Sequence, residues 1–172
     1  MIYRYLAEQV FRDLAPPLQE FLLATCVYPN VDVALLATAG YDNVAAMIDD
    51  LRKRVAFIHD ERDGIFRYHD LFRDFVQNQL AARGKNALCS AHERAARHLE
   101  RMGRIGDALT GYIAAEAAAE TARLLGAHGF DLIDAGRADL VRSALAAVAP
   151  GALRDEPGLL TLRGLFAVWD AQ

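Results

Sequence analysis

The sequence predicts a mainly α-helical protein that contains one small β-hairpin. Three observations lead to this prediction. The composition is 53% hydrophobic and rich in Ala and Leu, apolar residues recur with a helical period over most of the chain, and that period changes around residues 56–68. A chain of 172 residues can also bury a substantial core. We therefore expect a folded protein rather than a disordered one.

The first 54 residues contain four predicted helices. They cover residues 2–14, a segment from Pro16 or Pro17 to Cys26, residues 31–38, and residues 42–54. The proline pair ends the first helix and opens the second, and Gly40 ends the third. The first helix has an apolar side made of Tyr5, Leu6, Val10 and Leu14, and the fourth directs inward Val44, Met47, Ile48 and Leu51.

A β-hairpin and a further helix follow these four segments. The apolar stretches 56–58 and 65–68 flank a polar segment that contains the turn dipeptide Asp63-Gly64. The next helix carries an apolar stripe formed by Leu71, Phe72, Phe75, Val76 and Leu80. Helices, a hairpin and a final helix make a winged-helix arrangement. We place this first domain at residues 1–84.

The remaining residues, 85–172, are predicted to form antiparallel helical repeats of the tetratricopeptide type. An offset of 33 residues relates Leu99 to Leu132, and it also relates Gly103-Arg104 to Gly136-Arg137. The first of these helices starts at Asn86 or at the capping box Ser90–Glu93. Further helices cover 116–127, 137–148 and 157–170, and the last of them would open a third repeat. A solenoid needs about three repeats, so we expect the chain to be a fragment of a longer protein.

Charge and motif content exclude several classes of function. The net charge is −4, and acidic residues offset the basic ones in the helix at 42–54 and at the hairpin tip, so direct nucleic-acid binding is not expected. No apolar run reaches membrane-spanning length and no signal peptide is recognised, which predicts a cytoplasmic protein. Cys26 and Cys89 have no motif spacing and should be reduced, buried packing residues.

No catalytic or metal-binding residues are predicted. The remaining histidines, His59, His92, His98 and His128, do not cluster, and no Cys/His spacing suggests zinc. Adjacent acids such as Asp49-Asp50 diverge on a helix. No phosphate loop of the GxxxxGK type and no GxSxG elbow occurs. We therefore expect a non-enzymatic chain with no cofactor of its own.

The candidate site is the dipeptide His69-Asp70, which lies where the second hairpin strand meets the next helix. A helix N-terminus presents N–H groups and positive partial charge, so it can hold an anion that a neighbouring histidine could detect. The alternative is structural: Asp70 caps the helix and His69 packs half-buried with one hydrogen bond. The residue types alone leave both interpretations open.

Over residues 5–83 the sequence resembles the large ATP-binding LuxR-type transcriptional regulators, the MalT-like family of STAND signal-transduction ATPases. The motifs that carry the resemblance are YLAEQV, FLLATCV and YHDLFRDF, in that order. In this family a nucleotide-binding domain precedes a winged helix, followed by tetratricopeptide-like repeats and a C-terminal LuxR helix-turn-helix. The resemblance extends more weakly across the repeats.

The resemblance implies a non-catalytic regulatory fragment that couples nucleotide state to the recognition of a small-molecule or protein inducer by the repeats. In STAND proteins a Met-His-Asp motif reads the β-phosphate of ADP, and here His69 and Asp70 match its last two positions, with Tyr68 in place of methionine. ATP or ADP would belong to the full-length parent, whose nucleotide-binding domain and helix-turn-helix would be intramolecular partners. The alternative is a stand-alone adaptor with a winged helix and a protein-binding solenoid.

Overall fold

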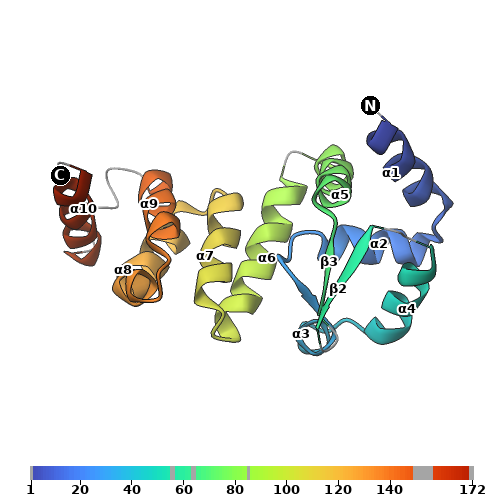
Figure 1. The fold of residues 1–172 in the computed structure, drawn as a ribbon, viewed down its shortest axis with the longest axis horizontal. Coiled ribbons are helices and arrows are strands. Elements are labelled where there is room, and N and C mark those ends of the chain that lie inside the picture. The colour runs from blue at the N-terminus through green and yellow to red at the C-terminus, as the bar shows by residue number, and fades with distance from the viewer. Residues whose placement is uncertain (1, 55–56, 63–64, 85, 149–156, 171–172) are drawn as a thin grey trace. The chain divides into compact units, whose positions relative to one another are not determined.

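The structure is a computed structural model that describes residues 2–54, 57–62, 65–84, 86–148 and 157–170. The chain divides into two compact units, Met1–Leu88 and Cys89–Gln172, which Figure 1 colours from blue to green and from green to red. Among the described helices, none combines the length and the apolar character needed to cross a membrane.

The first unit contains the predicted helices close to their expected bounds. They are α1 (Ile2–Asp13), α2 (Pro16–Thr25), α3 (Val33–Thr38), α4 (Val44–Arg54) and α5 (Asp70–Ala82). Helix α3 begins two residues later than predicted because Val31–Asp32 form a short strand, β1. Asp32 then caps α3, since its Oδ1 accepts a hydrogen bond from the Ala34 N–H at 2.8 Å.

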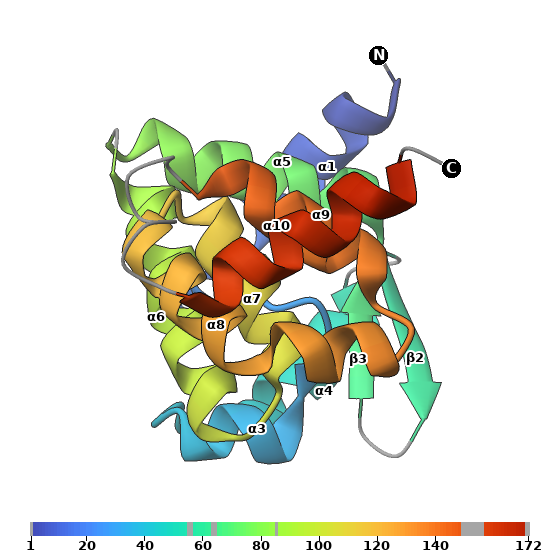
Figure 2. The same cartoon turned by 90° about the vertical axis from the view of Figure 1, so that its left-hand side faces the viewer.

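A three-stranded antiparallel sheet replaces the single hairpin of the prediction. The hairpin strands β2 (Ile58–Arg62) and β3 (Ile65–Tyr68) are present, and β1 pairs with the other edge of β3 to give the order β1-β3-β2. A two-residue strand has no measurable period, so β1 could not be predicted from the pattern. The predicted turn at Asp63-Gly64 lies outside the described residues. The two hairpin strands lie side by side in Figure 2.

The core of the first unit forms where α5 and the sheet meet α2. Phe66 and Tyr68 of β3 are buried, whereas Arg67 between them is exposed. In α5 the stripe Phe72, Phe75, Val76 and Leu80 is buried as predicted, but Leu71 is 50% exposed. Leu71 is the second residue of α5 and lies at the edge of the stripe.

Helix α1 turns a different side inward from the predicted one. Tyr5 is 63% exposed and Leu6 is 43% exposed, while Ala7 and Leu14 are buried. The Phe11 ring meets the Phe75 ring of α5 edge-on, with 5.9 Å between the ring centroids. Residues 7, 11 and 14 are spaced by four and three, so they form the packed line. Leu14 is buried as predicted, whereas the predicted Tyr5 and Leu6 are exposed.

The two cysteines of the prediction are both free thiols. Cys26 is buried at the end of α2, where burial raises the pKa of its thiol to about 12. This agrees with a packing role. Cys89 is only half-buried, so the prediction that it is buried was wrong.

The second unit consists of helices that pack against one another. They are α6 (Ala87–Arg101), α7 (Ile105–Ala114), α8 (Ala118–Asp134), α9 (Ala138–Ala147) and α10 (Pro157–Asp170). Helix α6 begins at Ala87, so the alternative capping box at Ser90 lies inside it. Helix α8 continues seven residues beyond its predicted end at 127. Gly129 supports this extension, because a Cβ there would lie 2.4 Å from Leu162 Cδ1 of α10.

The 33-residue offset corresponds to two equivalent turns. Gly103 (φ 73°) and Gly136 (φ 75°) occupy the left-handed region after α6 and α8. The next residue closes each turn, since the Arg104 N–H donates to Leu99 O at 2.9 Å and the Arg137 N–H donates to Leu132 O at 2.8 Å. These are Schellman caps, and they reverse the chain so that successive helices pack antiparallel.

A third cap of this type uses a residue other than glycine. After α7, Glu116 has φ 56°, and the Ala117 N–H donates to Tyr112 O at 3.0 Å. A side chain in the left-handed region crowds the backbone, and the cost in a helical context is about 1–2 kcal/mol. Glu116 is exposed, so the cost is conformational and does not come from a lost contact.

We expect Glu116→Gly to stabilise the second unit by about 0.5 kcal/mol, because relief of left-handed strain exceeds the extra entropy of an unfolded glycine. Glu116→Ala is the matched control, since it removes the carboxylate but keeps the Cβ. Thermal unfolding followed by circular dichroism should give a higher Tm for Glu116→Gly than for Glu116→Ala. Equal Tm values for the two variants would contradict the assignment of strain.

Candidate functional site

His69 occupies the junction between β3 and α5 and is itself the N-cap of α5. Its backbone is extended (φ −55°, ψ 136°), and its Nδ1 accepts a hydrogen bond from the Leu71 N–H at 3.3 Å. The ring nitrogen therefore takes the place of the side-chain oxygen of the usual capping residues. Because Nδ1 is the acceptor, the neutral ring carries its proton on Nε2.

Asp70 is the first residue of α5 and is not its cap. Its side chain is exposed, and Oδ1 accepts from Arg73 Nη2 at 3.0 Å. The backbone N–H groups of Phe72 and Arg73 both donate to His69 O at 2.9 Å. The structural alternative therefore assigned the cap to the wrong residue. Because these N–H groups at the start of α5 already have hydrogen-bond partners, an anion at this position would be bound mainly by side chains.

The His69 ring packs against the first strand of its own hairpin. Its centroid lies 6.4 Å from that of Phe57 and 5.8 Å from that of His59. The His69 N–H also donates to Phe57 O at 2.7 Å. The sequence pattern did not predict that His59 lies near His69, because residues ten positions apart become neighbours only when the hairpin forms. The structure therefore brings two histidines together.

Arg67 is on the same face of the hairpin as these histidines. It pairs in register with His59, and cross-strand partners direct their side chains to one side of a sheet. His69 follows Arg67 by two residues and so continues on that side. Arg67 and His59 are exposed, and His69 is half-buried. We call His59, Arg67 and His69 the outer-face triad.

Tyr68 faces the opposite way, into the core. Its hydroxyl lies 2.8 Å from Thr25 Oγ1, and Thr25 Oγ1 donates to Phe21 O at 2.7 Å. The threonine proton is thus committed, so the Tyr68 hydroxyl is the donor to Thr25. Burial raises the pKa of Tyr68. The tyrosine that stands in place of the family's methionine is therefore a core residue that anchors β3 to α2.

Two further features bear on function in the first unit. Within the described residues there is no group of three or more His, Cys, Asp or Glu side chains placed to hold a metal ion. On α4, Arg52 pairs with Asp49 at 3.4 Å and Arg54 pairs with Asp50 at 2.7 Å. Arg52 and Arg54 thus meet acids of the same helix.

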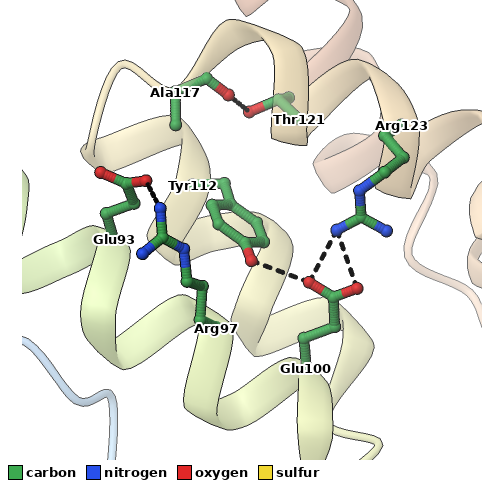
Figure 3. Close-up of polar contacts among 7 residues, drawn as sticks. All are labelled: Glu93, Arg97, Glu100, Tyr112, Ala117, Thr121 and Arg123. Carbon is green, nitrogen blue, oxygen red and sulfur yellow. Dashed lines mark hydrogen bonds and ion pairs between the residues drawn. The ribbon is translucent and has the colours of Figure 1, made fainter.

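A second polar cluster, in the second unit, was not predicted (Figure 3). Glu100 of α6 accepts a hydrogen bond from the Tyr112 hydroxyl of α7 at 2.8 Å, and Arg123 of α8 donates to both of its oxygens at 2.8 Å. One carboxylate thereby joins three successive helices. Along the 33-residue offset, Glu100 corresponds to Ile133 and Tyr112 to Leu145, so the second repeat is apolar where the first is polar.

The charges of this cluster stabilise one another. Burial alone would raise the pKa of Glu100, but the hydrogen bond from Tyr112 and the ion pair with Arg123 outweigh it and hold that pKa below its usual value. Burial, and then the bond to Glu100, raise the pKa of Tyr112 to about 12. The contrast between Tyr112 and Leu145 was the sequence signal that could have revealed the cluster. We call Glu100, Tyr112 and Arg123 the clasp.

Comparison with known proteins identifies the class and then the family. A winged helix followed by helical repeats is an arrangement of regulatory proteins, and residues 7–88 match the MalT winged helix domain. The chain is 27% identical over 169 residues to the HTH-type transcriptional regulator MalT of Vibrio cholerae, which covers 96% of this chain and 19% of that protein. It is 31% identical over 118 residues to the serine/threonine-protein kinase PknK of Mycobacterium tuberculosis, covering 67% of this chain and 11% of that protein.

This chain is therefore MalT-like, and residues 7–88 belong to the MalT winged helix domain family. The predicted resemblance and the predicted fold, a mainly α winged helix with helical repeats, are confirmed. The chain spans less than a fifth of the length of either relative. The predicted domain boundary at residue 84 and the tetratricopeptide assignment stay predictions.

We expect Glu100→Gln to destabilise the second unit by about 1 kcal/mol at pH 7, because it removes the charge that Arg123 requires. A carboxyl group whose pKa is lowered by folding stabilises the folded state at pH values above its unfolded pKa of 4.5. This stabilisation is lost as the pH falls through the pKa of the folded state. The difference from the wild type should therefore shrink below pH 4.5.

Urea unfolding at several pH values measures this difference, with Glu93→Gln as the control. Glu93 lies on the same helix and pairs with Arg97, but an i,i+4 pair of this kind contributes only about 0.5 kcal/mol or less. A loss that is equal in the two variants, or that does not change with pH, would show that the clasp is not ionic.

Proposed function

We propose that this chain is the hinge and sensor section of a longer, ATP-dependent LuxR-type transcriptional regulator of the STAND class. In this proposal its winged helix follows the nucleotide state of a preceding domain, and its repeats recognise an inducer. The section itself is non-catalytic and acts in the cytoplasm. Support comes from the family match over residues 7–88 and from the MalT similarity along nearly the whole chain.

The observation that carries the nucleotide-sensing part is the placement of His69. Its Nδ1 is occupied by the Leu71 N–H, so the donor available to a ligand is Nε2–H. The ring is half-buried between α5 and the hairpin, and this holds its direction. A fixed N–H donor beside a helix N-terminus suits a phosphate oxygen. We therefore propose that His69, with Asp70 beside it, contacts the β-phosphate of ADP bound in the parent.

The repeats are proposed to supply inducer recognition and to contribute to self-association. Among the aromatic residues of the repeats, Phe130 is 45% exposed and Trp169 is 44% exposed, whereas Tyr112 and Phe166 are buried. The first two are therefore available to a small-molecule or protein inducer, and the second two are packing residues. The partners in this proposal also include the nucleotide-binding domain and the C-terminal helix-turn-helix of the same polypeptide.

The second candidate is a stand-alone adaptor that binds other proteins through its repeats. Exposed apolar residues on α10, Leu160 (52%) and Val168 (59%), favour it. The similarity to a protein named as a kinase is consistent with a sensor that can be joined to different output domains. An in-frame ATPase domain encoded directly upstream of Met1 would support the regulator, and its absence there would support the adaptor.

We expect His69→Ala in the full-length regulator to weaken ADP retention and raise basal transcriptional activity. His69→Asn separates sensing from capping, because asparagine is a preferred N-cap residue but presents no N–H at the Nε2 position. Release of a fluorescent ADP analogue should be accelerated about ten-fold in both variants, the effect of losing one hydrogen bond to a charged group. If the asparagine variant releases ADP at the wild-type rate, His69 is only a cap.

A further inference from the structure

The exposed face of helix α6 in the second unit is made of arginines. Between residues 91 and 101 the exposed side chains are Arg94, Arg97 and Arg101, and every other residue of that stretch is buried or half-buried. Spacings of three and four place the arginines on one line along the helix. This line extends over about 10 Å, because an α-helix rises about 1.5 Å per residue. We call these residues the arginine stripe.

The positive charge of the stripe is available at both of its ends. Within the part of the chain that the structure describes, the side chains of Arg94 and Arg101 have no ion pair and no hydrogen bond. Arg97 lies between them and donates to Glu93, one turn earlier on the same helix (Figure 3). The other acid of α6 belongs to the clasp. Neither carboxylate of the helix therefore neutralises the two end arginines.

The fold does not require arginine at these positions. Along the 33-residue offset, the stripe corresponds to three exposed residues of α8, which are Ala127, Phe130 and Asp134. The equivalent helix of the next repeat thus forms with a small, an aromatic and an acidic residue in these places. Like charges three or four positions apart also destabilise a helix. The stripe opposes the stability of α6, and this favours a role in binding.

A partner of the stripe should carry carboxylates in a matching row. The planar guanidinium group of arginine can bind a carboxylate through two parallel hydrogen bonds. Acidic residues at spacings of three and four on a partner helix repeat with the same period as the arginines, so the two rows can pair along their length. Nucleic acid is a poorer match, because it requires a broad basic surface and this chain has a net charge of −4.

We propose that the arginine stripe is a docking surface for an acidic helix of a partner protein. Arg94 and Arg101 supply the two available charges, and the ion pair with Glu93 holds Arg97 in line between them. The surface belongs to α6 alone, so the inference does not depend on nucleotide sensing by His69.

The test is a titration of the 172-residue chain with a fluorescent helical peptide that carries glutamates at spacings of three and four. Fluorescence anisotropy should show binding that weakens as salt is added. A peptide with glutamine at the same places should not bind. Arg94→Gln and Arg101→Gln should each weaken binding about three-fold, and together about ten-fold, as expected for exposed ion pairs.

Arg163→Gln is the matched control. Arg163 is exposed on α10 of the same unit, and its side chain has no ion pair among the described residues. The control should leave the affinity unchanged. The Tm of Arg101→Gln should equal that of the wild type or exceed it slightly, because this change removes a like charge beside Arg97.

Four results would overturn the proposal. The first is a loss of affinity in Arg163→Gln as large as that in Arg94→Gln. The second is equal binding of the glutamine and glutamate peptides. The third is a Tm that falls together with the affinity, because lost stability would then explain the weaker binding. The fourth is tighter binding of duplex DNA than of the peptide through the same arginines, which would identify a nucleic-acid surface.

Charge reversal gives a more specific check of the same surface. Arg94→Glu combined with Arg101→Glu should abolish binding of the glutamate peptide and create binding of a peptide with lysine at the same places. A reversed chain that still binds the glutamate peptide would show that it docks elsewhere, and the proposal would be wrong.

Discussion

The side-chain alternation of the central strand β3 is the constraint on which the first unit depends. Its two-residue period sends Phe66 and Tyr68 into the core and leaves Arg67 and His69 on the outer face. A slip of one residue would bury Arg67 and expose the aromatic rings, which makes the register strongly specified. Pairing on both edges and the bond from Tyr68 to Thr25 fix that register. The position of His69 is therefore a consequence of core packing.

The second unit depends on its turns and on the clasp. Left-handed caps reverse the chain at Gly103, Glu116 and Gly136, which sets the antiparallel arrangement of the helices. Apolar packing between helices is tolerant of small shifts. A carboxylate shared by Tyr112 and Arg123 does not tolerate such shifts, because each hydrogen bond requires its own distance and direction. The clasp thus specifies how α6, α7 and α8 fit together, while the second repeat uses Ile133 and Leu145 at the corresponding positions.

The sequence was sufficient for features that local chemistry decides. Helical periods, the proline boundary before α2, the hairpin and the 33-residue offset were all recognisable, and so was the helix start at residue 69. Features that require distant residues to meet were not recognisable. The strand β1, the inward side of α1, the neighbouring rings of His59 and His69, and the bond from Tyr68 to Thr25 depend on packing between segments. Capping by His69 was also missed, since histidine is not among the residues preferred there.

β3 and α5 together hold the His69 ring with Nδ1 toward the helix and Nε2–H toward the outer face. The most direct test is ¹⁵N NMR of the neutral His69 ring, in which protonated and unprotonated nitrogens have distinct chemical shifts. We expect a protonated Nε2 and an unprotonated Nδ1 that is hydrogen-bonded to the Leu71 amide. A ring protonated on Nδ1, or a mixture of both tautomers with no bond to Leu71, would contradict the account.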